Sequence, residues 1–265
     1  MQKKSLKFAA LVLALSVSAC GMLPEKTDET KDWSAAKLYS EARDELSAGN
    51  YEKAIQYFEK LESRYPFGTY AQQAQMEIAY ANYRVGDQAQ ALAAVDRFIK
   101  LHPNHPNVDY MYYLRGLINF SGNVGFLDFL TKQDPSERDP KATREAFDAF
   151  RQLAERFPNS VYTKDAIARL KYLVNAMAQY EVHVANYYYR RGAYLAAANR
   201  AQTAISQYQN TPAVEEALFI MVRAYDAMGL TDLRDDAERV MQKNFPNSVY
   251  FKGGQNKSDP WWKIW

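Results

Sequence analysis

The sequence predicts an all-α fold, a solenoid of five helical hairpins, from two observations. In three stretches, 49–66, 86–103 and 229–246, a glycine is followed 17 residues later by a proline, and apolar residues recur between them at helical spacing. The period is also constant, because the glycines of two successive units are 37 residues apart near both ends of the chain. A fixed period of this size indicates repeats that stack on one another.

Alanines surround these glycines at matching distances. They stand seven positions before and five positions after three of the glycines: Ala42, Ala54, Ala79, Ala91, Ala185 and Ala197. Small side chains there allow two antiparallel helices to approach closely. The unit of helix, short turn, second helix and proline resembles the tetratricopeptide repeat (TPR), and Tyr51 and Phe58 also match that consensus. A single hairpin cannot bury both of its faces, so several are expected to stack.

The hairpins can be placed in order along the chain. We expect them at about 34–66, 70–103, 107–158, 161–209 and 212–246, within a solenoid that spans 33–248. The third is interrupted at 121–139 by a segment rich in Gly, Asp, Ser and Pro, whose role the sequence leaves open, and its second helix should start near Pro140. Residues 161–190 contain neither Gly nor Pro and keep a helical period, which predicts one helix of about 29 residues.

The first 32 residues are typical of a bacterial lipoprotein. Residues 1–19 combine a basic start with an apolar run that is too short to span a membrane, as in a signal peptide. Cys20, the only cysteine, follows Val-Ser-Ala, which resembles the lipobox whose cysteine is acylated, although leucine is more usual than Val17. An ordinary signal peptide with an incidental cysteine is the alternative. Residues 20–32 are expected to form a lipidated flexible tether.

The residue after the cysteine and the charge balance bear on location and partners. Gly21 stands where an aspartate would suggest retention in the inner membrane, so by analogy with other lipoproteins we expect the outer membrane. The formal charge is +2, with 33 basic and 31 acidic side chains, and three of the lysines lie in the segment expected to be removed. This near balance argues against nucleic acid as the main partner.

No catalytic constellation is visible. The composition is globular, with 48% hydrophobic and 24% charged residues, but Gly-x-Ser-x-Gly, P-loop and Rossmann glycine motifs are missing. His102 and His105 are three residues apart, yet the proline after each favours extended backbone over the helical turn of a zinc site, and no third ligand is nearby. We therefore expect a non-enzymatic protein with no metal and no cofactor.

Several segments go beyond a generic repeat. They are Arg-Tyr-Pro-Phe-Gly-Thr-Tyr at 64–70, Asp-Arg-Phe-Ile-Lys-Leu at 96–101, His-Pro-Asn-Val-Asp-Tyr at 105–110, Arg-Gly-Leu at 115–117, Arg-Asp-Pro at 138–140, Tyr-Tyr at 187–188, Arg-Gly-Ala at 191–193 and Asn-Arg at 199–200. Together these resemble the BamD family, also called ComL, over nearly all of residues 33–250. The tether and the Trp-rich tail at 249–265 look unlike other members.

The resemblance implies a fold, a location and a set of partners. Members of the family have five TPRs and are lipoproteins of the outer-membrane β-barrel assembly (BAM) complex. They bind the periplasmic POTRA domains of the insertase BamA, and they help to deliver unfolded outer-membrane protein clients. The resemblance thus implies a scaffold that is lipid-anchored on the periplasmic face of the outer membrane, with BamA and other BAM lipoproteins as partners.

Two sites are expected, one in each half. Tyr65, Phe67 and Tyr70 lie at the junction of the first two repeats, where aromatic side chains could receive an extended client segment. The alternative is that they only pack one repeat on the next. Arg200 matches the family's Asn-Arg arginine, which faces the POTRA region, and we expect its guanidinium to point outward, away from an apolar face that includes Leu195. A solvated surface arginine is the alternative.

Two competing functions and one segment stay open at this level. A periplasmic TPR scaffold for cell-wall or division proteins is the main alternative, and an envelope hydrolase with a helical solenoid is a further one. The tail at 249–265 ends in Asp-Pro-Trp-Trp-Lys-Ile-Trp. It could be a docking peptide for a partner, or it could fold back onto the last repeat as a cap.

Overall fold

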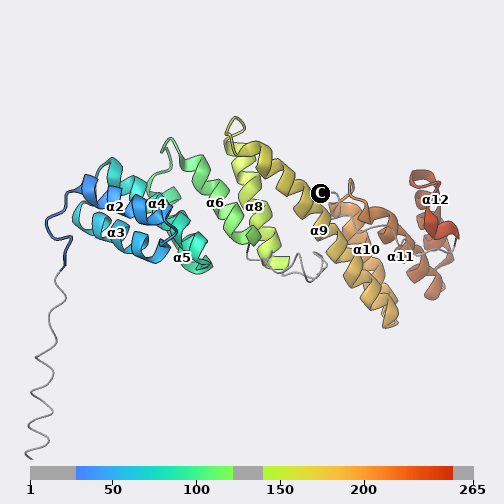
Figure 1. Cartoon of the computed structure of the whole chain (residues 1–265). Helices are drawn as coiled ribbons and strands as arrows, with labels where there is room; N and C mark the ends of the chain where they lie inside the picture. The colour runs from blue at the N-terminus through green and yellow to red at the C-terminus, as the bar shows by residue number, and fades with distance from the viewer. Residues whose placement is uncertain (1–27, 122–139, 253–265) are drawn as a thin grey trace, which may run out of the picture.

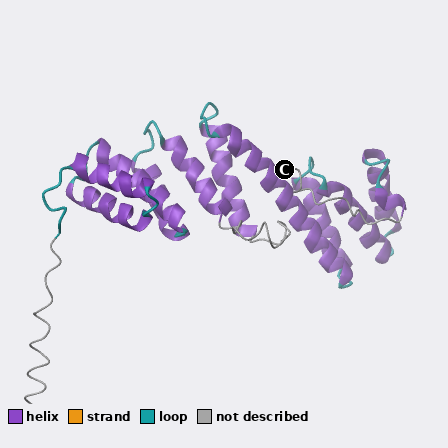
Figure 2. Cartoon of the chain, in the orientation of Figure 1, coloured by secondary structure: helices purple, strands orange, loops and turns teal. Residues whose placement is uncertain are grey.

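The computed structural model describes residues 28–121 and 140–252, and within these ranges the chain is helical without any strand (Figures 1 and 2). The helices pair into five antiparallel hairpins, which confirms the predicted fold class. The pairs are α2 (Ala35–Ser47) with α3 (Tyr51–Arg64), α4 (Thr69–Val85) with α5 (Gln88–Leu101), α6 (Val108–Ser121) with α8 (Pro140–Arg156), α9 (Thr163–Arg190) with α10 (Tyr194–Gln207), and α11 (Ala213–Ala227) with α12 (Thr231–Asn244). A short 3-10 helix, η3 (Val249–Lys252), follows α12.

The turn inside a hairpin depends on a glycine. Gly86 ends α4 with φ +90°, in the left-handed region, and its amide donates back to the carbonyls of Asn82 and Tyr83. Gly229 adopts φ +71° at the same point of the fifth hairpin. A residue with a side chain is strained at such φ values. The regularly spaced glycines of the sequence therefore mark places where the chain reverses.

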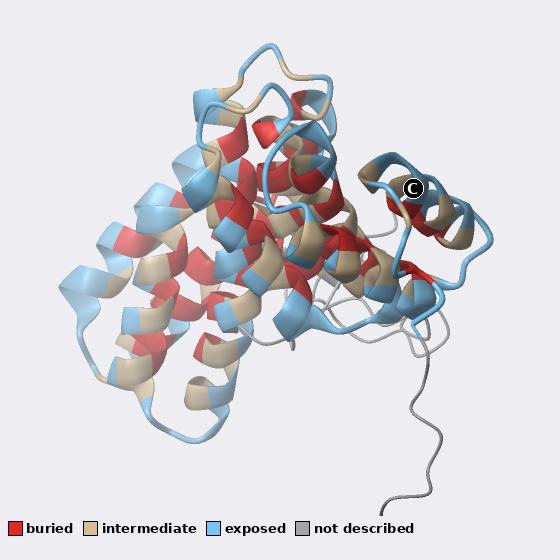
Figure 3. Ribbon diagram, turned by 90° about the vertical axis from the view of Figure 1, so that its left-hand side faces the viewer, coloured by how far each residue is buried: buried red, intermediate tan, exposed pale blue. Residues whose placement is uncertain are grey.

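Alanines hold the two helices of a hairpin close together. All six alanines of the repeat pattern have no exposed surface: Ala42, Ala54, Ala79, Ala91, Ala185 and Ala197. The core forms four successive clusters along the stack, and buried residues lie between the helices throughout (Figure 3). Three of these clusters each contain a completely buried phenylalanine: Phe58, Phe98 and Phe150. Neighbouring hairpins therefore cover the apolar faces that a single hairpin leaves exposed, as in other solenoids.

Helix α9 joins the two halves of the solenoid. It runs from Thr163 to Arg190 without a break, which confirms the single long helix predicted from the sequence. Its first half, with Ala166 and Leu173, packs in the cluster of α6 and α8, whereas Val182 and Ala185 belong to the cluster of α10, α11 and α12. None of the helices in the described part of the chain is both long and apolar enough to cross a membrane.

The described chain begins with a polar clamp on α3, made from residues that the sequence assigned to the tether. The Asp28 carboxylate accepts hydrogen bonds from Lys60 Nζ at 2.7 Å, from the Thr30 hydroxyl at 2.7 Å and from Arg64. Arg64 also donates to the Thr30 carbonyl. Hydrogen bonds from Lys60 and Thr30 hold the pKa of Asp28 well below its usual range. Residues 20–27 lie outside the described residues.

We expect Asp28→Asn to release this clamp without unfolding the solenoid. Exposed ion pairs contribute little to global stability, so the melting temperature should stay within about 2 °C of the parent. Hydrogen exchange at the Thr30 amide, which donates to Asp28 Oδ1 at 3.2 Å, should accelerate. Because the pKa of Asp28 is lowered, the clamp should persist from neutral pH down through the ordinary aspartate range and open only at lower pH. Unchanged exchange at Thr30 in the variant would contradict this assignment.

Candidate functional site

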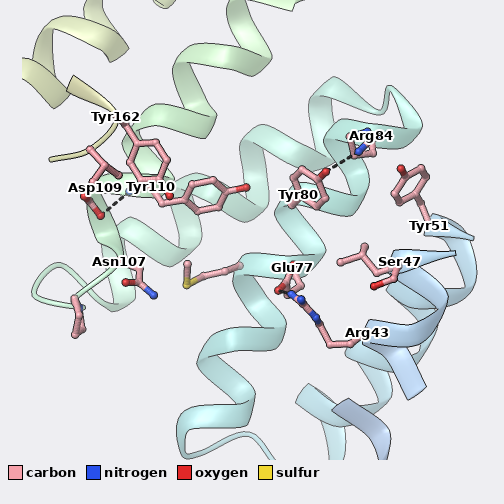
Figure 4. A pocket seen from close by; sticks show the side chains of 14 residues that line it. Arg43, Ser47, Tyr51, Glu77, Tyr80, Arg84, Asn107, Asp109, Tyr110 and Tyr162 are labelled. Atoms are coloured by element: carbon pink, nitrogen blue, oxygen red, sulfur yellow. Dashed lines mark hydrogen bonds and ion pairs between the residues drawn. The ribbon is translucent and has the colours of Figure 1, made fainter. Parts of the chain in front are cut away.

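The first helices of the first three hairpins form a hollow that we call the inner groove (Figure 4). It has a volume of about 810 Å³ and is lined by α2, the start of α3, α4, the start of α6 and the turn that precedes α9. Helix α4 contacts both α2 and α6 directly, so the groove floor is continuous across three repeats. Its aromatic and charged lining includes Arg43, Tyr51, Glu77, Tyr80, Arg84, Tyr110 and Tyr162.

One wall of the inner groove is an arginine between two phenol rings. The Arg84 guanidinium lies 4.8 Å from the ring centroid of Tyr51 and 5.6 Å from that of Tyr80. It also donates a 2.6 Å hydrogen bond to the Tyr80 hydroxyl, and it has no carboxylate partner among the described residues. The cation is therefore positioned by aromatic contacts, and its charge is not neutralised by an anion of the wall.

The other wall is aromatic. Tyr110 and Tyr162 lie with ring centroids 5.6 Å apart, and Tyr162 stacks on Tyr113 at 4.9 Å. Burial, with a further contribution from the charge of Glu77, raises the pKa of Tyr110 well above its usual range, so this phenol stays protonated at any physiological pH. Between the walls, Arg43 and Glu77 form an ion pair that bridges α2 and α4. The groove thus offers phenol hydroxyls, ring faces and the Arg84 cation, which has no carboxylate partner in the described part of the chain.

The three predicted client-binding residues lie elsewhere. Tyr65, Phe67 and Tyr70 lie at the end of α3, in the following turn and at the start of α4, and none of them lines the inner groove. The Tyr65 hydroxyl donates to the Trp33 carbonyl at 3.0 Å, and Tyr70 packs on Tyr39 with ring centroids 5.4 Å apart. Phe67 is 91% exposed. Tyr65 therefore helps to pack the first repeat and Tyr70 packs the second repeat on the first, while Phe67 is freely exposed.

Part of the inner groove has a signal in the sequence. Tyr80 and Arg84 are four residues apart on one helix, so their side chains share a face. Tyr51 matches the TPR consensus and begins the second helix of the preceding repeat. Tyr110 and Tyr162 have no such signal, because α6 and the turn before α9 meet only in the tertiary structure.

The Arg200 guanidinium is accessible, as expected, but it has a partner that the sequence did not predict. Arg200 Nη1 lies 3.1 Å from Glu181 Oε2, across from α10 to α9, and this hydrogen bond raises the pKa of the guanidinium. The Glu181 side chain is only 10% exposed, whereas that of Arg200 is 44% exposed. The expectation that Leu195 belongs to the buried face of α10 is wrong, because its side chain is 63% exposed. The buried residues of this helix are Ala197, Ala198, Ala201 and Ala204. Arg200 remains accessible, but as half of an ion pair.

The other residues and segments singled out in the sequence include the lipobox cysteine, the insertion, the tail and two histidines. Cys20, the insertion at 121–139 apart from Ser121, and the tail beyond Lys252 lie outside the described residues. His102 Nε2 donates to Gln75 Oε1 at 3.0 Å, and the imidazole, like that of His105, packs against Phe98. Among the described residues, no group of three or more His, Cys, Asp or Glu side chains could hold a metal ion.

Comparison with known proteins decides the family. A family model described as an outer membrane lipoprotein, YfiO, matches residues 31–241, which is most of the solenoid. The chain belongs to the YfiO family. It is 50% identical over 265 residues to a Neisseria meningitidis serogroup B protein named outer membrane protein assembly factor BamD, covering 99% of both chains. A Vibrio cholerae protein with the same name is 37% identical and covers 90% of this chain and 99% of its own.

The YfiO family membership confirms the BamD resemblance and sets a coarse function. A third relative, from Haemophilus influenzae, is 34% identical, covers 91% of each chain and carries the same assembly-factor name. The relatives are named as assembly factors of outer membrane proteins, which agrees with the prediction of a non-enzymatic protein and disfavours an envelope hydrolase. The match spans both halves, so the inner groove and the Arg200–Glu181 pair both lie within the family's common region.

Proposed function

We propose that this YfiO-family protein is a lipid-anchored scaffold on the periplasmic face of the outer membrane, where it binds unfolded outer-membrane proteins and the insertase BamA. Full-length similarity to proteins named as BamD assembly factors supports this role. Acylation of Cys20 would provide the anchor, and the segment 21–27 would link it to the clamp on α3. Other BAM lipoproteins are further expected partners.

The observation that carries client binding is the inner groove. Its walls present ring faces and phenol hydroxyls, which suit an extended segment with aromatic and apolar side chains and exposed backbone carbonyls. Arg84 has no carboxylate partner among the described residues, so it can hold a carbonyl or carboxylate of the incoming chain. The lining residues of the groove come from three successive repeats. A site that extends over several repeats favours an extended peptide as the ligand over a compact small molecule. We therefore move the proposed client site from Tyr65, Phe67 and Tyr70 to this groove.

Site-specific photo-crosslinking tests the placement. A photoreactive residue at Tyr80 or Tyr110 should capture the carboxy-terminal strand of an unfolded β-barrel protein, because both side chains line the groove. Tyr65 and Tyr70 serve as the competing positions and Leu233, 47% exposed on α12, as the distant control. Arg84→Ala should reduce capture at Tyr110 without a loss of helicity. Capture that is strongest at Tyr65 or Tyr70 would restore the original site, and equal capture at Leu233 would exclude a specific groove.

A scaffold for division or cell-wall proteins is the competing function. The partners that this protein retains in membrane extracts discriminate between the two functions. Affinity isolation from solubilised membranes should recover a BamA-like insertase. Recovery of a murein or division complex without an insertase would favour the competing scaffold.

A further inference from the structure

A second hollow lies at the other end of the solenoid, and the proposed function does not use it. This C-terminal cavity has a volume of about 390 Å³ and lies between the second half of α9, α11 and η3. Its lining combines aromatic rings with charged groups: Tyr189, Arg190, Glu216, Phe219, Arg223 and Tyr250. It belongs to the same face as the inner groove, because α9 and α11 are the first helices of their hairpins.

The chemistry of the cavity suits a flat aromatic ring. The Arg223 guanidinium lies 4.5 Å from the ring centroid of Tyr189 and 5.6 Å from that of Phe219. Among the described residues, neither Arg190 nor Arg223 has a carboxylate partner, whereas Glu216 is satisfied by Asn186 Nδ2 at 2.7 Å. A guanidinium that lies near ring faces and has no anionic partner among the described residues can contact a further aromatic ring, and indole is the strongest partner for such a cation–π contact.

The chain itself supplies an aromatic segment next to this cavity. Tyr250 of η3 lines the cavity and stacks on Phe219 with ring centroids 4.6 Å apart. The residues that follow η3 in sequence include three tryptophans: Trp261, Trp262 and Trp265. Trp261 comes nine positions after Lys252, a distance of at most about 30 Å for an extended chain, so the segment can reach the cavity.

We propose that the Trp-rich segment 259–265 docks in the C-terminal cavity of the same chain, with an indole against Arg223. Indole contacts rather than net charge would drive this docking, because the segment after Lys252 contains two lysines and a single aspartate. A cation–π contact becomes stronger when it is desolvated and then exceeds an exposed ion pair. Asp259, two residues before Trp261, can in addition pair with the unpartnered Arg190.

Tryptophan fluorescence of the purified full-length protein tests the docking. The chain has four tryptophans, so Trp33→Phe leaves only the three in the segment as reporters. We expect their emission to be blue-shifted and protected from acrylamide relative to a synthetic peptide of residues 253–265. Arg223→Glu should abolish both the shift and the protection, and Arg223→Gln should weaken them. Arg239→Glu is the matched control, since Arg239 is exposed on α12 outside the cavity.

Three outcomes would overturn the proposal. Emission and quenching equal to those of the free peptide would show that the segment is not docked. Protection that Arg223→Glu and Arg239→Glu leave equally intact would place the segment elsewhere. Protection that disappears on dilution would mean that a second copy or another partner provides the site. Far-UV circular dichroism checks that each variant keeps its helices, and Arg223→Gln, which adds no charge, serves if Arg223→Glu does not fold.

Discussion

Gly116→Ala is expected to lower the free energy of unfolding by about 3 kcal/mol. A β-carbon on Gly116 of α6 would lie 2.8 Å from Cζ of Phe150 on α8, and closer still to two other ring carbons. The Phe150 ring has no exposed surface and cannot move aside, because Tyr113, Phe120 and Arg169 surround it. The clash therefore separates α6 from α8 in the third of the five hairpins.

A double-mutant cycle measures this clash directly. Phe150→Leu alone should destabilise the protein, since it leaves a cavity in a tightly packed cluster. In Gly116→Ala/Phe150→Leu the smaller side chain makes room for the new methyl group, so the double variant should be more stable than the sum of the single effects by at least about 1 kcal/mol. Urea unfolding followed by circular dichroism gives these values. Additive effects would mean that Gly116 is required for another reason than the approach of Phe150.

Arg200→Glu is expected to reduce both stability and insertase binding. Charge reversal places a second carboxylate beside Glu181, whose side chain is 10% exposed, and removes the only partner that it has among the described residues. Loss of a hydrogen-bond partner for a buried charged group costs about 2 kcal/mol after allowance for the partial exposure of Arg200.

A neutral pair separates binding from folding. Glu181→Gln/Arg200→Gln keeps a hydrogen bond between α9 and α10 but removes both charges, so its melting temperature should stay close to that of the parent. If Arg200 also holds a carboxylate of the insertase, calorimetry with purified POTRA domains should show binding weakened by about 2 kcal/mol in this variant. Glu181→Gln alone, which frees the guanidinium from its internal partner, should bind at least as tightly as the parent. Unchanged affinity in the double variant would remove Arg200 from the interface and leave it a purely structural role.

The sequence predicted the scaffold more completely than the sites. Period, glycines and alanines depend on local rules, since a left-handed turn needs glycine and a close helix pair needs small side chains. That is why Ala42 and Ala54, chosen by spacing alone, proved fully buried. The aromatic residues were harder to place, because tyrosine suits both cores and binding surfaces. Tyr65 and Tyr70 were chosen for their motif, yet in the structure they contact Trp33 and Tyr39.

By itself the sequence determined the solenoid of hairpins, the single long helix α9 and the family to which the chain is similar. Only the tertiary structure decided which polar residues meet. The inner groove gathers Arg43, Tyr80, Tyr110 and Tyr162 from segments more than a hundred positions apart at the extremes, and Arg200 reaches Glu181 on the preceding helix. The physical reason is that a repeat period fixes which face of each helix is buried, whereas the partner of an exposed or half-buried side chain depends on how neighbouring repeats are stacked.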